Sequence, residues 1–462
     1  MSAPSWSAAR REVLVAALGG TDSLARTIAT AGARGAYLAR AVLTGRIPTE
    51  AEVERDHIAF AENADLALAA IEHDARRGPR RMRTLPVRVV AGTVVDVTDS
   101  ASSPFTTGIQ RVAREVVAAW STGGGIELGA FTRDGSFRTL TGAESERAGS
   151  AAAVPPPALL VPDGAAFCLP EIATERGRAL RLAAVARYGS RTSIAVGHDC
   201  IPITTAQTAP PGMPGAFAGY LAALARFDRV AVTSGASFAE FAGWAAMLPA
   251  AGLTPPVVEL VELPFAPLDV EPEPEAEVRA ALGLGGARVV LVVGSHEPRK
   301  NHLTILTAAE LAWRAGSAFR LVLAGGRSWD AAEFDALVAR LRAAGRPIEL
   351  VVGVSDARLA GLYALAEVSV FASFNEGYGL PVAESIAAGT PVITADYGSQ
   401  RELGLDRGAI LVDPTDPRAI AGAITAVLDE DSLRQTLAAE AGRSVRGSWP
   451  DYAARLGTAL RR

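Results

Sequence analysis

VSVFASFNEGYGLPVAESIAAGTPVITA, residues Val368 to Ala395, is the stretch of the sequence that decides the fold. An apolar run predicts a buried strand, a glycine-rich loop follows it, a helix is expected from about Leu380 to Ala388, and the segment PVITA supplies a second strand. Pro381 suits the first turn of a helix, where its missing N–H costs nothing, and Gly389 suits the left-handed cap that ends one. The stretch therefore predicts a strand–loop–helix–strand unit whose loop lies at the carboxyl end of a strand.

The glycine-rich loop of this unit is suited to an anionic ligand. At the carboxyl end of a parallel sheet, free backbone N–H groups and the dipole of the following helix both point at the ligand. Gly377 and Gly379 allow the backbone to approach that ligand closely. Glu376 lies in the loop and Glu384 one turn into the helix. Glu376 would therefore face the reacting end of the ligand, and Glu384 could accept hydrogen bonds from a ribose.

The two glutamates, with seven residues between them inside NEGYGLPVAESIAAGTPVI, resemble the signature of retaining glycosyltransferases of the GT-B fold, specifically family 4. An ordinary turn and a solvated glutamate would explain each acid separately, but not the glycines, the proline, both acids and the GTPVI strand together. The resemblance implies an α/β protein with two Rossmann-like domains that face a cleft. It also implies that the loop holds a donor diphosphate through the backbone at Gly377, Tyr378, Gly379 and Leu380.

The composition fits a protein with more than one globular domain. The 462 residues are enough for two or three domains of roughly 100 to 200 residues each. A formal net charge of −5 argues against general nucleic-acid binding as the primary role. Cys168 and Cys200 give no disulfide framework and no metal-ligand spacing, and we find neither a membrane-spanning apolar run nor a signal peptide. We therefore expect a soluble protein of the reducing cytoplasm.

The first 86 residues differ from the rest, because they show helical periodicity and no convincing strands. We expect a helical extension here, outside the part that resembles family 4. Its apolar periodicity rests on Val13, Leu14, Leu18, Ile58, Phe60, Leu66, Leu68 and Ile71. The extension ends in RRGPRRMR, Arg76 to Arg83, with five arginines in eight residues. This run is either a solvated linker or a peripheral contact with anionic lipid headgroups on the inner face of a membrane, which would suit a lipid-linked acceptor.

Strand signals begin at Val87, and residues 87–270 predict an N-terminal Rossmann-like domain that would present the acceptor. VRVVAGTVVDVT, Val87 to Thr98, predicts its first strand, and SPFTTGIQRVAREVVAAW predicts a loop that runs into an amphipathic helix. FTTGIQR resembles the N-terminal glycine loop of family 4, whose backbone lies against the donor diphosphate and the acceptor. The resemblance assigns this contact to Gly108, and Arg111 is a second candidate for an anion contact.

His198 and Asp199 follow the short apolar strand of SIAVGHDCIPI. A lone histidine is usually structural, but the whole sequence has five, and this one stands beside an acid at the carboxyl end of a strand. The position resembles that of the family's histidine at the inter-domain cleft, which contacts the transferred sugar. Asp199 could bind the acceptor, orient His198 or act as a base, and the sequence leaves these three roles open.

A segment rich in proline and glutamate separates the two predicted domains. Three prolines and four glutamates fall between Pro267 and Glu277, so we place a linker at 271–277 and a C-terminal Rossmann-like nucleotide-sugar domain at 278–462. The final segment, SWPDYAARLGTALRR, commonly crosses back to the first domain in proteins of the GT-B fold.

Two adjacent cations lie near the start of the second domain. RVVLVV is typical of a strand buried on both faces, and EPRKNH after it brings Arg299 and Lys300 to the carboxyl edge of the sheet. Two cations at such an edge suggest a diphosphate, which they can neutralise as it leaves. The run resembles family 4, in which a lysine after Pro-Arg holds the donor phosphates, although Ser295 stands where the motif often has arginine. In relatives, the loop that corresponds to Gly353 and Val354 binds the base.

Together these features predict a retaining, metal-independent glycosyltransferase. It would move a hexosyl group, mannosyl or similar, from a nucleotide-diphosphate sugar to a glycan or lipid-linked glycan. No Asp-x-Asp motif lies at a suitable strand end and the basic pair can replace a cation, so we expect no metal and no cofactor besides the donor substrate. TTGIQR and EPRKNH resemble enzymes of surface-polysaccharide synthesis, which favours a bacterial mannosyl- or rhamnosyl-type transfer.

Two alternatives use the same fold. The protein could be a non-catalytic component of a polysaccharide assembly complex that binds a nucleotide sugar or a glycan. It could also be a sugar-nucleotide epimerase. A dinucleotide oxidoreductase is disfavoured, because no strand is followed by G-x-G-x-x-G with a downstream ribose-binding acid.

Overall fold

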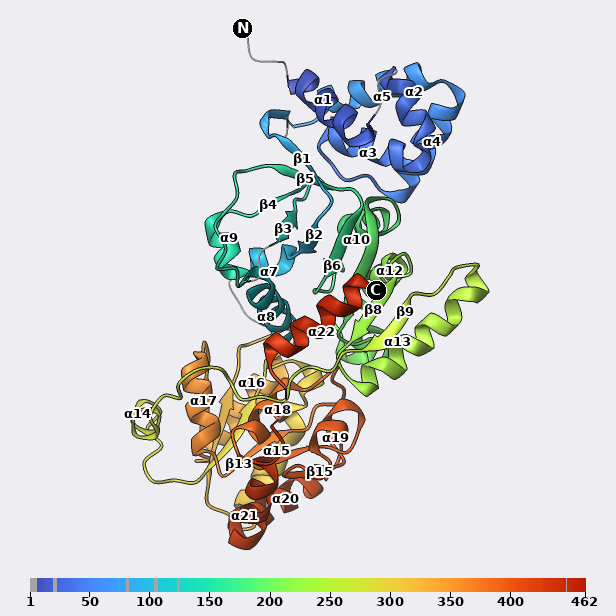
Figure 1. The fold of residues 1–462 in the computed structure, drawn as a ribbon. Coiled ribbons are helices and arrows are strands. Elements are labelled where there is room, and N and C mark those ends of the chain that lie inside the picture. Colours follow the sequence, from blue (N-terminus) through green and yellow to red (C-terminus); the bar gives the residue numbers. More distant parts are fainter. Residues whose placement is uncertain (1–5, 20–22, 80–82, 104–106, 123–124, 446) are drawn as a thin grey trace.

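Two β-sheets, one after the other along the chain, form the framework of the computed structural model (Figure 1). The structure describes residues 6–19, 23–79, 83–103, 107–122, 125–445 and 447–462. In this part of the chain, each pair of neighbouring strands in the C-terminal sheet is parallel. The spatial order of that sheet is β12 (Ile348–Val351), β11 (Arg320–Ala324), β10 (Val289–Val293), β13 (Val368–Phe371), β14 (Val392–Ala395) and β15 (Ala409–Val412).

The C-terminal sheet follows the apolar runs that the sequence shows. Strand β10 is almost entirely buried, as a strand covered on both faces must be. The helices of this half alternate with the strands of the sheet along the chain. They are α15 (His302–Arg314), α16 (Ala332–Ala343), α17 (Asp356–Leu365), α18 (Leu380–Ala387), α19 (Gly398–Gly404), α20 (Pro417–Asp429) and α21 (Asp431–Ala441).

The N-terminal sheet is larger and mixed. Within the described residues its strands are parallel, except that β4 pairs antiparallel with both of its neighbours. The spatial order is β1 (Val87–Val90), β5 (Leu159–Pro162), β4 (Phe137–Thr139), β3 (Ile126–Phe131), β2 (Thr93–Asp96), β6 (Ala165–Leu169), β7 (Ser190–Gly197), β8 (Arg229–Val232) and β9 (Val257–Leu260). The helices of this half are α7 (Thr98–Ser102), α8 (Gly108–Thr122), α9 (Gly142–Arg147), α10 (Arg176–Ala184), α11 (Ile201–Thr204), α12 (Met213–Leu224) and α13 (Gly235–Met247).

The single strand predicted from Val87 to Thr98 is wrong, because the structure divides it into β1 and β2. Strand β1 pairs with β5 at the sheet edge, whereas β2 lies between β3 and β6. The chain moves from one position to the other at Ala91 and Gly92. Both strands contribute buried apolar residues, so the apolar pattern continues across the break and conceals it.

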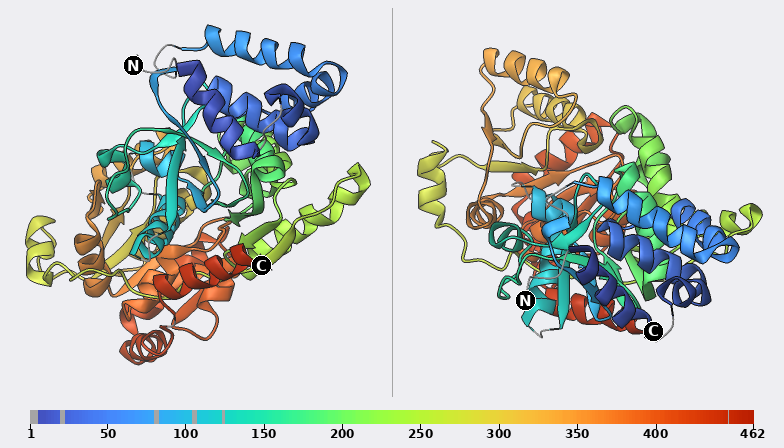
Figure 2. Two further views of the ribbon diagram at one scale, coloured as in Figure 1. Left: turned by 45° about the horizontal axis from the view of Figure 1, so that its top comes forward. Right: turned by 90° about the horizontal axis from the view of Figure 1, so that it is seen from above.

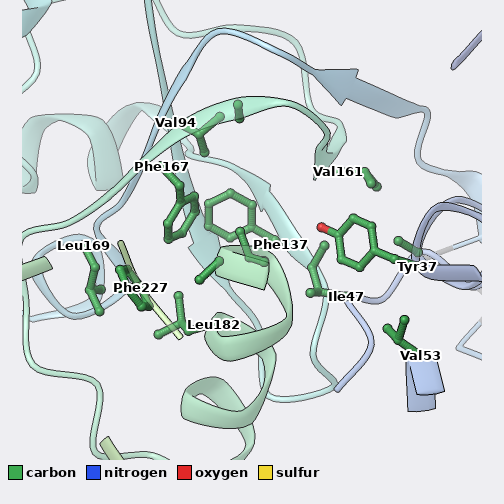
Figure 3. Packing of buried hydrophobic residues seen from close by; sticks show 14 of the residues in the cluster. Tyr37, Ile47, Val53, Val94, Phe137, Val161, Phe167, Leu169, Leu182 and Phe227 are labelled. Atoms are coloured by element: carbon green, nitrogen blue, oxygen red, sulfur yellow. The ribbon is translucent and has the colours of Figure 1, made fainter. Parts of the chain in front are cut away.

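The described part of residues 6–77 is mostly helical, as predicted, but these helices are not a separate extension. They are α1 (Trp6–Leu18), α2 (Leu24–Thr30), α3 (Gly32–Thr44), α4 (Glu50–Glu62) and α5 (Ala64–Arg77), and Figure 2 shows them over the N-terminal sheet from two further directions. Tyr37 and Ile47 lie among the same buried residues as Phe137 and Val161 of the sheet (Figure 3). The helical layer and the sheet therefore share one core.

Two apolar residues of the predicted periodicity in this layer do not enter that core. Ile58 is 59% exposed and Leu66 is 68% exposed. Phe60 and Ile71, on the same two helices, are buried. Apolar spacing alone could not separate the two sets, because helix α4 has only a narrow buried face.

The connection between the halves is shorter than the predicted linker at 271–277, because the chain is already helical from Glu275 in α14 (Glu275–Ala281). Glutamates in the first turn of a helix interact favourably with the helix dipole, so the acidic run begins a helix as well as ending a linker. The final helix α22 (Trp449–Arg461) crosses back as predicted: Trp120 Nε1 on α8 donates to Ala453 O at 2.9 Å. Within the described residues, no helix has both the length and the apolar character required to cross a membrane.

Candidate active site

A glutamate and two cations meet at the carboxyl edge of the C-terminal sheet. The Glu376 carboxylate lies 2.7 Å from Lys300 Nζ and 2.7 Å from Arg299 Nη1. A second contact joins Arg299 Nη2 to Glu297 Oε1 at 2.7 Å. The structure therefore brings together the first glutamate of the predicted signature and both predicted phosphate-binding cations.

Asn301 fixes the turn that carries these cations. Its φ angle of 59° is left-handed, a region that asparagine tolerates better than most residues. The Asn301 Nδ2 atom donates to Ala372 O at 2.9 Å and to Pro414 O at 2.7 Å. The turn Pro298–Lys300 is thus tied to the end of β13, where the loop that carries Glu376 begins.

The two cations keep Glu376 charged. Burial raises the pKa of Glu376, but the charges of Arg299 and Lys300 lower it by more, to about 2. Burial lowers the pKa of Lys300, and the charge of Glu376 opposes that shift. Lys300 is also the only lysine in the sequence. All the other residues counted as Lys or Arg are arginines. The compact ammonium group of the only lysine side chain therefore lies in this ion cluster.

Gly377, the residue after Glu376, contacts the N-terminal half. A Cβ atom on Gly377 would lie 2.2 Å from His198 O, so only glycine fits this approach without a shift. Ser234 Oγ donates to Gly377 O at 2.5 Å, and Ser237 Oγ lies 2.9 Å from Gly377 O and 2.6 Å from His198 O, so its single proton is shared between these two carbonyl oxygens. Hydroxyl groups after β8 therefore join the predicted histidine to the predicted donor loop.

His198 is held as a neutral ring. It is buried, its Nε2 lies 2.8 Å from Pro170 O, and burial lowers its pKa to about 4. A carbonyl oxygen only accepts, so Nε2 carries the proton and Nδ1 is left as an acceptor. The ring can therefore accept a hydrogen bond from a sugar hydroxyl without carrying charge at neutral pH.

Asp199 faces the same ion cluster. Burial raises its pKa to about 6, although the charge of Arg299 opposes the shift. Its Oδ1 atom accepts from the Ile201 amide at 3.1 Å. The structure thus places Asp199 near Arg299 and Glu376, and its role among the three named above stays a prediction.

Glu384 is engaged on both carboxylate oxygens. Arg111 Nη1 of the N-terminal half lies 2.5 Å from Glu384 Oε1, and the Tyr363 hydroxyl donates to Oε2 at 3.0 Å. Burial raises the pKa of Glu384, and Arg111 lowers it by less. Arg111 was predicted to contact an anionic ligand. In the structure it instead forms an ion pair with Glu384, the residue predicted to bind the ribose.

The remaining predicted residues surround this centre. Gly108 begins α8, and a Cβ atom there would lie 3.4 Å from Leu380 Cδ1, so the N-terminal glycine loop lies against the start of α18. Gly379 is the N-cap residue of α18 and has a φ angle of 98°. Among the described residues, no side chain caps the amides of the first turn of this helix. The Tyr378 hydroxyl donates to Leu263 O at 3.2 Å, so its side chain points toward the segment that follows β9.

The predicted base-binding loop leads into α17, the helix that carries Tyr363. Gly353 has a left-handed φ of 68° and Val354 is partly buried. Asp356, two residues further on, is near enough to Glu384 for its charge to contribute to the raised pKa of that acid. The loop and the predicted ribose-binding acid are therefore neighbours.

Sequence reasoning missed the residues that contact this centre through uncharged groups. Ser237 and Tyr363 are two of them, and Ser399 Oγ, which donates to Glu376 O at 2.8 Å, is a third. All three residues lie inside ordinary helices. A hydroxyl carries no periodic or charge signal, so only the fold shows what it contacts.

Comparison with solved structures tests the predicted fold. Sucrose-phosphate synthase from Thermosynechococcus elongatus superposes with a TM-score of 0.60 at 18% identity, over 80% of this chain and 98% of that one. Anabaena Alr3699/HepE, solved in complex with UDP-glucose, gives a TM-score of 0.60 at 14% identity, over 80% and 99%. These similarities confirm the predicted GT-B fold.

Sequence comparison then places the C-terminal half in a family. Residues 275–444 match the model of the family described as glycosyl transferases group 1, so this part of the chain is a domain of that family. Serotype-specific mannosyltransferase WbdA of Escherichia coli is 26% identical over 369 residues, 75% of this chain. D-inositol 3-phosphate glycosyltransferase of Thermobispora bispora is 36% identical over 222 residues, 43% of this chain and 52% of that protein. The chain spans 43% of the length of WbdA.

Proposed function

We propose that the protein transfers a mannosyl or similar hexosyl group from a nucleotide-diphosphate sugar to a glycan or lipid-linked glycan, with retention of configuration. The observation that carries this proposal is the meeting of Lys300, Arg299 and Glu376 at the point where Gly377 touches His198. Cations from one half and a neutral hydrogen-bond acceptor from the other meet there. A departing diphosphate needs the first, and the hydroxyls of a transferred sugar suit the second.

The chemistry would run as follows. As the bond between sugar and diphosphate breaks, negative charge grows on the leaving group, and Arg299, Lys300 and the amides of the loop up to Leu380 stabilise it. Glu376 and Nδ1 of His198 position the sugar, on which positive charge develops. The acceptor hydroxyl oxygen forms the new bond to the anomeric carbon on the face that the diphosphate leaves, and the hydroxyl proton passes to the departing diphosphate. The cations already supply the charge that a metal ion would bring, so we propose that no metal takes part.

The names of similar proteins support the choice of donor and sugar. WbdA and O-antigen chain mannosyltransferase B of Escherichia coli are named as mannosyltransferases. HepE was solved with UDP-glucose, which supports a nucleotide sugar as donor. Glu384 would bind the ribose, and the backbone of Gly353 and Val354 the base.

Calorimetric titration with GDP, UDP and dTDP in buffer with a chelator tests the proposal. We expect one nucleotide to bind at micromolar concentration, and Lys300→Ala to weaken it about tenfold or more, because a charge-assisted contact is lost. Arg288→Ala removes one positive charge at the opposite end of β10 and serves as the control. Since Lys300 is the only lysine, protection of a side-chain amine from an amine reagent by the nucleotide reports on this site alone. If a folded protein binds none of the three, the non-catalytic alternative is favoured instead.

We also propose that the helical layer makes peripheral contact with an anionic membrane on its cytoplasmic side. The Arg83 guanidinium lies 5.9 Å from the centre of the Trp6 ring. Beside them a cavity of about 270 Å³ is lined in part by Trp6, Arg11, Glu72 and Arg76. Residues 80–82 of the Arg76–Arg83 run lie outside the described residues. Sedimentation with phosphatidylglycerol vesicles but not with phosphatidylcholine vesicles is the expected result, and equal binding to both would contradict it.

A further inference from the structure

One buried ion pair crosses between the two halves at the candidate donor site. Arg111 Nη1 lies 2.5 Å from Glu384 Oε1, and their side chains are 18% and 8% exposed. Arg111 belongs to α8 of the N-terminal half, whereas Glu384 belongs to α18 of the C-terminal half. Contacts of Gly377 with Ser234 and Ser237, and of Asn375 with Thr204, also join the loop to the N-terminal half, and these are between uncharged groups.

Local structure holds Arg111 in this position. The Thr107 amide donates to Gln110 Oε1 at 3.0 Å and the Gln110 amide approaches Thr107 Oγ1 at 3.3 Å, a reciprocal cap that fixes the start of α8. Arg111 follows directly, and Gly108 lies against Leu380 at the start of α18. The guanidinium is therefore directed at Glu384 by a capped helix end.

The carboxylate of Glu384 has little room for further partners. One oxygen meets Arg111, and the other accepts from Tyr363, which is itself buried. A carboxylate oxygen can accept more than one hydrogen bond, but Glu384 is only 7% exposed, so ribose hydroxyls that donate to it would compete with Arg111 at Oε1 and with Tyr363 at Oε2.

We propose that Arg111 is a residue that competes with the donor: it holds the place on Glu384 that the ribose takes, so the ion pair and the bound nucleoside exclude each other. The inference rests on the proposed function, in which Glu384 binds the ribose. Donor binding thereby releases the one ion pair that we find between the halves at this loop within the described residues.

A second carboxylate can receive the released guanidinium. Glu115 lies one turn further along α8, at the i+4 position that suits an ion pair with Arg111. The charge of Arg111 already acts on Glu115, and Asp269 and Asp356 face the same residue. Arg111 can therefore leave Glu384 without its positive charge losing every nearby carboxylate.

Titration with two ligands separates this role from direct phosphate binding. The wild type and Arg111→Ala are titrated with the nucleoside diphosphate that the wild type binds, and with pyrophosphate, which carries no ribose. We expect Arg111→Ala to bind the nucleoside diphosphate at least threefold more tightly and pyrophosphate within twofold of the wild type. Arg88→Ala is the matched control, because it breaks an Arg–Glu pair of the same 2.5 Å length, with Glu127 on β3, away from Glu384. Arg111→Gln, which keeps side-chain length without charge, repeats the test if Arg111→Ala does not fold.

Each other outcome overturns the inference in a recognisable way. Weaker binding of both ligands by the variants makes Arg111 a phosphate ligand. Unchanged nucleoside diphosphate binding means that the ion pair does not compete with the ribose. If the folded wild type binds pyrophosphate but no nucleoside diphosphate, or binds neither, the proposed function fails, and the inference falls with it.

Discussion

The loop that carries Glu376 and Gly377 contacts its own half and the opposite half by different kinds of interaction. Within the C-terminal half, Glu376 is joined to Arg299 and Lys300 by buried ion pairs. Toward the N-terminal half, the Gly377 carbonyl accepts from the hydroxyls of Ser234 and Ser237. The charged contacts fix the loop within one half, while uncharged contacts attach it to the other.

The two kinds of contact differ in the free energy that is lost when they break. Removing one partner of a buried ion pair costs about 3 to 5 kcal/mol, because a charge is left unpaired. A neutral hydrogen bond contributes about 1 kcal/mol net, because water replaces the lost partner when the halves part. The hydrogen bonds from Ser234 and Ser237 to Gly377 can therefore break while the cation cluster stays formed. Arg111 and Glu384 are an exception, and the donor itself would break that ion pair.

The largest expected effect comes from Gly377→Ala, which tests whether close approach of the halves is required. The added methyl would lie 2.2 Å from His198 O, so the halves must move apart. We expect sugar transfer to fall by about 100-fold or more, equivalent to about 3 kcal/mol in the barrier, while the nucleotide still binds to the C-terminal half. Gly422→Ala on α20, where nothing lies within 4 Å of the added methyl, is the control. Transfer at the wild-type rate by Gly377→Ala would show that the observed approach has no part in catalysis.

A smaller effect, on stability, is expected from Glu376→Gln, which removes the charge from the ionic side of the loop. Two buried cations lose their shared partner, so we expect the free energy of unfolding in urea to fall by about 3 kcal/mol. Glu297→Gln removes one contact of Arg299, which keeps Glu376, and about 1 kcal/mol is expected. Equal losses in the two variants would contradict the view that Glu376 is the shared counter-ion.

The C-terminal half, which contains the ion pairs of Glu376, was also the half that could be predicted in most detail. Its strands are continuous apolar runs, and its site residues are charged or glycine, so EPRKNH and NEGYGLPVAES identify both the elements and the loop ends. Gly389, predicted as a left-handed cap, has a φ angle of 80°. Local patterns suffice there, because strand, loop and helix follow one another within a few residues.

The N-terminal half required information that its sequence does not carry locally. The break between β1 and β2 depends on which distant strands they pair with, and the burial of the helical layer depends on a sheet formed later in the chain. The pairing of Arg111 with Glu384 joins residues 273 positions apart. Tertiary contacts of this kind have no periodic signal, so the site residues could be named individually, while their partners across the halves could not.

Stability against pH tests the smallest effect, whether His198 is held neutral in the folded protein. The folded-state pKa of His198 is about 4, below its ordinary 6.5, so its contribution to stability is fully present above pH 6.5 and is lost as pH falls toward 4. Between pH 7.5 and pH 5 the wild type should lose about 2 kcal/mol relative to His198→Gln, which does not titrate. Asp199 has the opposite sign, because its pKa is raised to about 6, so relative to Asp199→Asn the wild type should gain stability over the same fall in pH. Urea unfolding of the three proteins at both pH values measures the two slopes. If His198→Gln follows the wild type at every pH, His198 is not held neutral, and the face toward Gly377 would become charged in mild acid.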